Sequence, residues 1–272
     1  MSAQKMQQEQ FETFTEEFEL KLEDSYLKFK KIEAYPGRPF IVFLHDSLGC
    51  IALWKQFPET LAMAHRCNVL LYDRMGYGGS TAFVYQNRDI NYLEQEADTL
   101  QKILQVLKIK KLILYGHSDG GSIALLAAAK YPDLVEAIIS EGAHVFVEEC
   151  TLQGIKYMQN VYETSNLKRV LQKYHGDKTE TVFQMWANTW LSSRYRSWNI
   201  EHFLPRITCP VFVMQGEMDE YGTEAQVGAI ANQVLGKSVK FVVPKAKHSP
   251  HKETPKLVLQ KVGQWIEQVL VT

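Results

Sequence analysis

Short, almost continuous apolar runs alternate along the chain with longer stretches in which apolar residues recur every three or four positions. The later short runs are dense in Ile, Val and Leu, a composition typical of strands buried on both faces of a sheet. These runs predict eight strands, at residues 18–22, 26–32, 40–44, 68–72, 112–115, 137–140, 210–214 and 239–243. A short turn joins the first two strands, which predicts an antiparallel pair at one edge of the sheet.

Helical spacing of apolar residues is clearest in three segments. Residues 93–107 form one stripe, and residues 227–234 form another between a Thr223–Gln226 capping box and a stop at Gly236. The last helix begins at Thr254–Pro255 and places its apolar residues on one face, at positions 258, 262, 265, 266 and 269. Strands that alternate with such crossover helices predict an α/β domain, with a mostly parallel eight-stranded sheet and helices on both faces.

The alternation breaks between residues 144 and 206, where the pattern is helical throughout. Two apolar stripes lie in this segment, at 155–162 and 183–190, and the segment holds three of the five tryptophans. No linker rich in Pro, Gly or Ser separates it from its neighbours. We therefore expect residues 144–206 to form a helical cap, inserted into a core made of residues 1–143 and 207–272.

Composition and charge narrow the range of partners. The 30 basic and 31 acidic residues leave a net charge of -1, so no field of one sign is available to hold nucleic acid or an anionic membrane. A small-molecule substrate is therefore the expected partner, and the sequence leaves a homodimer open. The first ten residues lack the apolar core of a signal peptide and no apolar run could span a bilayer, so we expect a cytoplasmic protein. The four cysteines include no CxxC pair, which indicates buried, reduced thiols.

The segment GHSDG matches G-x-S-x-G, a sharp turn that lifts a serine hydroxyl above a sheet edge, between a strand and a helix. The residues two before and two after the nucleophile must be small, because the strained turn brings their Cα atoms against neighbouring backbone. Gly116 and Gly120 meet this requirement for Ser118. A carboxylate nucleophile at Asp119 would put the bulky His117 where a small residue is needed. Ser118 is therefore the predicted nucleophile.

A serine alcohol needs a base, and the base needs a group that orients it. The segment VFVMQGEMDEYG ends a predicted strand with three acids, of which Asp219 is the predicted orienting group. We expect Glu217 and Glu220 to anchor the loop or to face solvent. The next strand leads into KAKHSPHKETP, in which His248 is the predicted base and His251 is expected to support the last helix.

Together these segments resemble the α/β-hydrolase superfamily, over nearly everything after residue 18. IVFLHDS resembles the oxyanion loop of that family, DRMGYGGS its D-x-x-G-x-G-x-S turn, and HSPHKETP its His-x-x-x-x-Glu-x-Pro segment. The chain order Ser118, Asp219, His248 is the order of this architecture. The resemblance implies a catalytic triad that needs no cofactor. By position, it assigns the backbone N–H groups of Ser47 and Asp119 to the oxyanion hole.

One position departs from the pattern of the family. Asp46 stands where the resemblance expects Gly after the strand-end histidine, and Asp cannot adopt every glycine conformation cheaply. This residue leaves the shape of the oxyanion loop open. Carboxylates beside an oxyanion raise its energy unless they point away or pair with a cation, and we expect those of Asp46 and Asp119 to point away.

Three residues of the predicted cap are candidates for the substrate pocket. Trp186 and Trp190 are expected to dock the cap onto the sheet, and they also suit the ceiling of an apolar acyl pocket. His144 begins the cap and is a candidate for the pocket wall. We expect no metal site, because His248 and His251 have no third ligand nearby.

These inferences predict a serine hydrolase that cleaves a small, largely uncharged carboxylic ester through an acyl-enzyme intermediate. One alternative is a carbon–carbon bond hydrolase that acts on a diketone with the same triad. Basic residues converging on the pocket would favour it, and Arg74 and Arg194 are the candidates. The other alternative is a small-molecule receptor on this fold that does not turn over its ligand.

Overall fold

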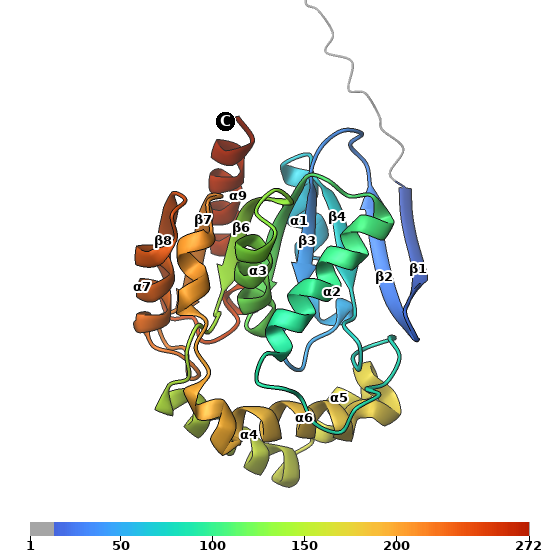
Figure 1. Cartoon of the computed structure of the whole chain (residues 1–272), viewed down its shortest axis with the longest axis vertical. Coiled ribbons are helices and arrows are strands. Elements are labelled where there is room, and N and C mark those ends of the chain that lie inside the picture. Colours follow the sequence, from blue (N-terminus) through green and yellow to red (C-terminus); the bar gives the residue numbers. More distant parts are fainter. Residues whose placement is uncertain (1–13, 272) are drawn as a thin grey trace, which may run out of the picture.

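The computed structural model of the chain describes residues 14–271, and its centre is an eight-stranded sheet (Figure 1). The strands are β1 Phe14–Leu22, β2 Ser25–Glu33, β3 Phe40–Leu44, β4 Asn68–Tyr72, β5 Leu112–His117, β6 Val135–Glu141, β7 Val211–Gly216 and β8 Ser238–Val243. They lie in the order β1-β2-β4-β3-β5-β6-β7-β8, with β1–β2 and β2–β4 antiparallel and all other pairs parallel. The eight predicted strands and the antiparallel edge are confirmed. The first ten residues, which argued against a signal peptide, lie outside the described residues.

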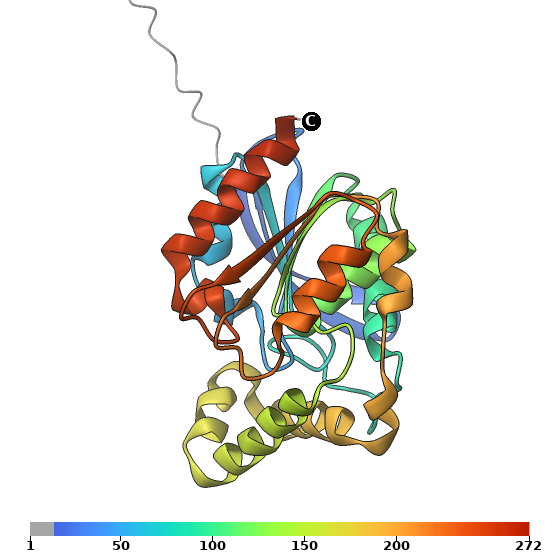
Figure 2. The same ribbon diagram turned by 90° about the vertical axis from the view of Figure 1, so that its left-hand side faces the viewer.

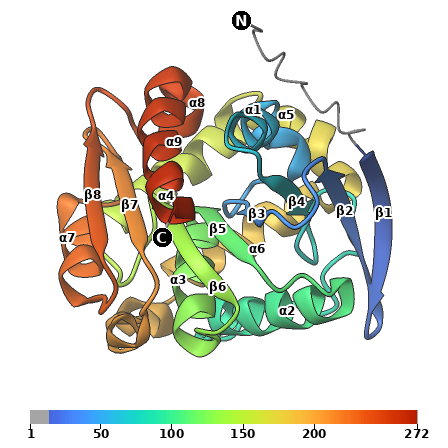
Figure 3. The same ribbon diagram turned by 90° about the horizontal axis from the view of Figure 1, so that it is seen from above.

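Helices cover both faces of the sheet (Figures 2 and 3). The helices are α1 Phe57–Ala64, α2 Tyr92–Leu107, α3 Asp119–Lys130, α4 Glu149–Thr164, α5 Leu167–His175, α6 Thr179–Leu191, α7 Glu224–Gln233, α8 Pro250–Glu253 and α9 Pro255–Val271. Short 3-10 turns are η1 Ile51–Trp54, η2 Gly176–Lys178, η3 Ser193–Ser197 and η4 Glu201–Arg206. One face carries α2, α3 and α7, and the other carries α1 and α9 (Figure 3). None of the helices within residues 14–271 has both the length and the apolar character that a membrane crossing requires.

The central strands are apolar along their whole length because both of their faces are buried. Side chains alternate between the two faces, so Val42 and Leu114 join the core beneath α2 and α3. Their neighbours Ile41 and Ile113 join the core beneath α1 and α9. Such a doubly covered sheet holds its strand ends rigidly, which is what a site built on those ends requires.

Helix α3 packs closely against the sheet because its residues are small. Residues 119–129 are all buried. A Cβ atom added to Gly121 would lie 2.8 Å from the Cβ of Ala143, so a larger residue would push the helix away from β6. The run of Gly, Ala and Ser after the GHSDG turn therefore sets the distance between α3 and the sheet.

Three helices, α4 to α6, lie below the carboxyl ends of the parallel strands and form a helical cap between β6 and β7 (Figures 1 and 2). The two chain segments that cross between core and cap run side by side. Ile200 donates its N–H to the carbonyl of Val145 at 2.8 Å, and Phe146 pairs with Asn199 in an antiparallel bridge. η4 packs against α3 and α7 of the core. The boundaries of the cap at residues 144 and 206 stay a prediction.

Gln226 departs from its expected role as half of a capping box. Thr223 caps α7 as predicted, accepting the N–H of Ala225. The buried Gln226 side chain accepts instead the N–H of Val145 at 2.8 Å and donates to the carbonyl of Phe146 at 3.0 Å. The Gln226 side chain therefore binds the backbone of residues 145 and 146 and does not cap the helix. These bonds connect α7 to the start of the cap.

Candidate active site

The turn between β5 and α3 presents Ser118 at the carboxyl end of the sheet. Ser118 has φ 56° and ψ -120°, a conformation that non-glycine residues rarely adopt. A Cβ atom at Gly116 would overlap the carbonyl group of Gly120, and one at Gly120 would overlap the carbonyl oxygen of Leu44. The expected requirement for small residues on both sides of Ser118 therefore holds, because backbone occupies the space.

A continuous chain of hydrogen bonds joins Ser118, His248 and Asp219. The Ser118 hydroxyl lies 3.0 Å from Nε2 of His248, and Nδ1 of His248 lies 2.9 Å from both carboxylate oxygens of Asp219. The Nδ1 atom must carry its proton toward the carboxylate, so Nε2 is left to accept the proton of the serine hydroxyl. The three residues predicted from separate segments of the sequence are thus neighbours in space.

Electrostatics favour an ion pair between His248 and Asp219. Burial acts to raise the pKa of Asp219, but the charge and the hydrogen bond of His248 outweigh it, so the pKa lies below its usual range. Burial acts to lower the pKa of His248, but the Asp219 carboxylate outweighs it and raises that pKa. The imidazolium form that proton transfer from Ser118 would create is therefore stabilised.

The other two acids of the loop do not touch the imidazole. Glu217 accepts the backbone N–H of Lys245 at 2.9 Å, so it anchors the loop as expected. Glu220 lines the cavity in front of Ser118. Asp219 is held by the N–H of Tyr221, which donates to its Oδ1 at 2.9 Å. Asp219 is therefore the acid that the loop presents to His248.

Two backbone N–H groups are free beside Ser118. Ser47 and Asp119 line the same cavity as Ser118. Within the part of the chain that the structure describes, neither N–H donates to a protein acceptor. Asp119 is the first residue of α3, so its N–H also carries the positive end of the helix dipole. Both groups are available to an oxyanion, the role that the sequence assigned to them.

Asp46 does not need the conformational freedom of glycine. It is not among the described residues with positive φ. Its Oδ1 accepts the N–H of Leu48 at 3.0 Å, and its carbonyl accepts Nη2 of Arg74 at 3.0 Å. Its Oδ2 lies 3.2 Å from Nδ1 of His117 and 3.6 Å from Nζ of Lys252. Side-chain contacts therefore hold the oxyanion loop in shape, and the Asp46 carboxylate lies beside a histidine and a lysine.

Asp119 also has a defined partner for its carboxylate. Its Oδ2 accepts the hydroxyl of Tyr92 at 3.0 Å and lies 3.7 Å from Nη2 of Arg74. Tyr92 in turn accepts the indole N–H of Trp190 at 3.1 Å. This buried chain connects the cap to the residue after Ser118. The sequence suggested no role for Tyr92, because the contact depends on the packing of α2 against α6.

The cavity in front of Ser118 has a volume of about 300 Å³ and lies between the sheet edge and the cap. The three pocket candidates from the sequence, Trp186, Trp190 and His144, all line it. Its apolar wall also includes Ile155 and Met158 from α4. Four carboxylates and no Lys or Arg lie on the described wall, those of Asp46, Asp119, Glu220 and Glu253, and the other ionisable groups there include the histidines His117, His144 and His248.

Arg74 and Arg194, the two cations that the sequence suggested for this pocket, lie elsewhere. Arg74 is fully buried and holds the oxyanion loop through the carbonyl groups of His45 and Asp46. Arg194 donates to the carbonyl of Arg88 and lines a separate hollow beside α6. Neither guanidinium reaches the Ser118 cavity because each is engaged by backbone carbonyls.

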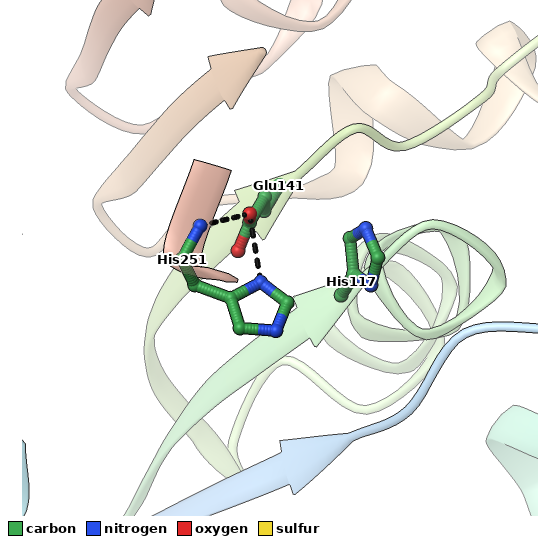
Figure 4. Close-up of side chains that lie close together, drawn as sticks. All are labelled: His117, Glu141 and His251. Atoms are coloured by element: carbon green, nitrogen blue, oxygen red, sulfur yellow. Dashed lines mark hydrogen bonds and ion pairs between the residues drawn. The ribbon is translucent and has the colours of Figure 1, made fainter. Parts of the chain in front are cut away.

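His117, Glu141 and His251 form a second cluster of ionisable groups (Figure 4), and the ring centroid of His117 lies 5.2 Å from that of His248. Glu141 Oε1 accepts both the N–H and the Nδ1 of His251 at 2.9 Å, and Oε2 accepts the hydroxyl of Tyr115 at 2.7 Å. Burial acts to raise the pKa of Glu141, but the His251 charge outweighs it and lowers that pKa to about 2. His251, which the sequence expected to support the last helix, therefore pairs with Glu141 at the end of β6 and lies near His117.

The same cluster has the residue types of a metal site, but most of its ligand atoms are already used. The candidate ligand atoms lie within 4.8 Å of one another. Nε2 of His117 faces the carbonyl of His248 at 2.8 Å, and its Nδ1 faces Asp46. Among the described residues, Nε2 of His251 is the ring atom of this cluster that has no partner. Hydrogen bonding therefore accounts for the cluster better than metal coordination does.

Comparisons with known proteins agree with this geometry. Residues 39–171 match the family model described as the alpha/beta hydrolase fold. A crystal structure of VinJ superposes with a TM-score of 0.72 at 21% identity and covers 93% of this chain and 99% of that one. A crystal structure of a membrane phospholipase A gives a TM-score of 0.76 at 17% identity, over 95% and 87% of the two chains. The chain therefore has the α/β-hydrolase fold, and just under half of it matches the family model.

In sequence the chain is similar to proteins with different activities. It is 29% identical to the human Serine hydrolase BPHL over 191 residues, which cover 67% of this chain and just under two thirds, 64%, of that protein. It is 25% identical to the Karrikin insensitive 2 receptor IA of Petunia hybrida, over 82% and 88% of the two chains. It is 24% identical to the 2-succinyl-6-hydroxy-2,4-cyclohexadiene-1-carboxylate synthase of Salmonella arizonae, over 84% and 94%. The relatives thus include a serine hydrolase, a receptor and a synthase, so the reaction must be argued from the site.

Proposed function

We propose that the protein is a serine hydrolase that cleaves small, neutral carboxylic esters. The observation that carries this proposal is the hydrogen-bonded chain Ser118–His248–Asp219, which faces a cavity with two free backbone N–H groups. A nucleophile, a base, an orienting carboxylate and an oxyanion hole are the four parts that acyl transfer requires. The similarity to a human serine hydrolase supports the same class of reaction.

The reaction would proceed in two halves at the same atoms. Oγ of Ser118 attacks the ester carbonyl carbon while its proton passes to Nε2 of His248. The carbonyl oxygen becomes an oxyanion that accepts the N–H groups of Ser47 and Asp119. Collapse of this intermediate breaks the ester C–O bond, and His248 returns the proton to the departing alcohol. Water then attacks the acyl-enzyme in the same manner and releases the carboxylic acid and Ser118.

The cavity argues for a neutral substrate of modest size. A volume of about 300 Å³ is at the small end for ligand pockets. Trp186, Trp190 and Met158 offer apolar contact to an acyl chain. Four carboxylates and no Lys or Arg line the described wall, so an additional negative charge on the substrate would be unpaired there.

We expect a neutral butyrate ester to be hydrolysed with a kcat/KM at least about tenfold above that of the matched succinate monoester. Like charges about 6 Å apart repel by on the order of 1 to 3 kcal/mol at an effective dielectric constant near 20, and 1.4 kcal/mol corresponds to tenfold in rate. The measurement is kcat/KM for both esters at low and high salt, because screening should narrow the difference.

The matched 4-aminobutyrate ester is the control for the sign of the charge. If repulsion by carboxylates is the cause, the cationic ester is not penalised as the succinate ester is. Equal penalties for both ions would show that burial of any charge is the cause. A preference for the succinate ester would contradict the proposed repulsion by carboxylates. It would favour a substrate that carries a carboxylate, a group that the name of the Salmonella arizonae synthase also contains.

Trp186→Ala is expected to shift the acyl-length preference toward longer chains, because Trp186 lines the cavity and its removal deepens the pocket. The measurement is kcat/KM for acetate to decanoate esters of one alcohol. Trp198→Ala is the matched control: Trp198 is a buried cap tryptophan that does not line the cavity. It should cost about 3 to 5 kcal/mol of stability and leave the length preference unchanged. Identical length profiles for Trp186→Ala and the wild type would remove Trp186 from the pocket.

The two alternative functions have less support from the site. The carbon–carbon bond hydrolase depended on Arg74 and Arg194, and neither lines the cavity. The receptor remains a candidate because of the similarity to the Petunia receptor. Labelling by a fluorophosphonate tests it, since a serine that is activated for turnover reacts with this probe and an inert one does not. Binding of esters without labelling or product would favour the receptor.

A further inference from the structure

Asp46, the residue that departs from the family pattern, contacts the histidine that precedes the nucleophile. We propose that His117 is a positioning residue that holds the His248 loop to the oxyanion loop, and that Asp46 is the charge partner that orients it. This inference deepens the proposed function and rests on it for its kinetic consequences. The geometry itself does not depend on the identity of the substrate.

Both ring nitrogens of His117 face hydrogen-bond acceptors. Nε2 lies 2.8 Å from the backbone carbonyl of His248, and Nδ1 lies 3.2 Å from Oδ2 of Asp46. A ring that carries a proton on each nitrogen satisfies both contacts, and the Asp46 carboxylate balances its charge. The side chain of His117 is only 2% exposed, so solvent competes little with these two contacts. One buried ring therefore joins the loops that carry the base and the oxyanion donors.

A second anchor holds the same loop three residues later. Glu141 accepts the backbone N–H and the Nδ1 of His251, both at 2.9 Å. The backbone carbonyl of Glu141 also accepts the N–H of Ser118 at 2.8 Å. The loop from His248 to His251 is thus bonded at one end to His117 of β5 and at the other to Glu141 of β6, and Figure 4 shows the contact between Glu141 and His251. With His251 held by Glu141, the bond from His117 fixes the end of the loop that carries the catalytic imidazole.

The charged groups around His248 set its pKa, so a change at His117 should be measurable as a change in that pKa. Asp219 and Asp46 raise the pKa of His248, although burial acts to lower it, and Glu220 adds to the raising effect. The rings of His117 and His144 lie 5.2 Å and 6.0 Å from that of His248. Among the described residues, His251 and Glu141 are further ionisable groups near His117, and Lys252 lies near its partner Asp46. Because the Asp46 carboxylate raises the pKa of His248 and His117 is a partner of that carboxylate, we expect the loss of the His117 ring to raise the pKa of His248 further.

The test compares His117→Phe, His117→Gln, Asp46→Asn and the His117→Phe/Asp46→Asn double variant with the wild type. For each protein, the rate of fluorophosphonate labelling at Ser118 and the kcat and KM for the butyrate ester are measured as a function of pH. We expect His117→Phe to lower kcat about 10- to 100-fold with KM within about twofold, because small displacements of a base cost rate rather than binding. Its acid limb should move to higher pH, and the double variant should move it back.

The conservative variant separates positioning from simple packing. The amide of His117→Gln can still donate to the carbonyl of His248, so this variant should recover most of the kcat lost in His117→Phe. His65→Gln is the matched control, because His65 forms a histidine–carboxylate pair of the same length, 3.2 Å to Glu267, outside the cavity. It should leave the pH profile of labelling and turnover unchanged. If His117→Phe does not fold, the pH profiles of His117→Gln and Asp46→Asn decide the matter.

If the kcat and the acid limb of His117→Phe equal those of the wild type, His117 has no positioning role. Equal losses in His117→Phe and His117→Gln, with unmoved pH profiles, would also overturn it and leave packing as the role of the ring. Absence of ester turnover and labelling in the wild type would refute the proposed function instead. In that case the positioning role is tested by NMR titration of the His248 ring in the same proteins. An unmoved titration in His117→Phe would contradict it.

Discussion

Replacing Ser118 by Ala is expected to abolish ester hydrolysis, with a loss in kcat on the order of 10⁵-fold or more. The hydroxyl oxygen is the atom that would form the acyl-enzyme, and no other described hydroxyl lies within hydrogen-bonding distance of Nε2 of His248. The fold should survive, because Ala adds no atoms to a turn that already accommodates the Ser118 backbone at φ 56°. Initial rates with the butyrate ester and fluorophosphonate labelling measure the effect, with circular dichroism as the check on folding.

Ser238→Ala is the control for the loss of a serine hydroxyl. Ser238 is exposed on β8, and its hydroxyl donates to the carbonyl of Ala231. This variant should keep wild-type turnover and labelling. If Ser118→Ala retained half of the wild-type activity, Ser118 would not be the nucleophile. The assignment of His248 as its base would then fail as well.

Asp219→Asn is expected to reduce kcat by about 10³- to 10⁴-fold, because an amide can turn its own N–H toward Nδ1 and favour the wrong tautomer of His248. It should also move the acid limb of kcat/KM to lower pH. The base works only when His248 is neutral, and the Asp219 carboxylate raises the pKa of His248. Without that carboxylate the His248 ring loses its proton at a lower pH. The residual kcat/KM should therefore reach its plateau at a lower pH than in the wild type. A pH profile of kcat/KM between about pH 4 and 9 measures both effects.

Glu217→Gln is the matched control on the same loop. Its carboxylate accepts the N–H of Lys245 and makes no contact with the imidazole, so the amide oxygen can replace it. We expect kcat within about twofold of the wild type and an unmoved acid limb. A larger loss in Glu217→Gln than in Asp219→Asn would mean that the orienting acid has been assigned to the wrong residue.

These two predictions depend on features of the site that the sequence suggested to different degrees. Ser118 could be assigned locally, because the glycine spacing of GHSDG is required by a turn in which backbone fills the space of a Cβ. His248 and Asp219 depended on their places at the ends of predicted strands and on the chain order of the family. The structure brings them within 3.0 Å of their partners. Their catalytic roles remain the prediction that the variants test.

The sequence by itself determined the layered architecture of this protein. Apolar runs and helical stripes are local signals, since each reports only whether a segment is buried on one face or two. Eight such runs with intervening helices are sufficient to specify a mostly parallel sheet covered on both faces. The cap could be recognised for the same reason, because a long helical stretch interrupts the alternation between β6 and β7. The predicted role of Gln226 failed where packing against Val145 competed with a local cap.

Only the tertiary structure decided how the charges around the site are paired. In the sequence, Asp46 departed from the family pattern with no partner in view, His251 was expected to support the last helix, and His117 had no assigned catalytic role. The bonds that give them partners join residues far apart in the chain: His117 to the carbonyl of His248 across 131 positions, and His251 to Glu141 across 110. Hydrogen bonds act over about 3 Å in space and leave no periodicity in the sequence. Residue patterns can therefore locate the strand ends that carry such groups, whereas the choice of partner is made by the way those ends meet.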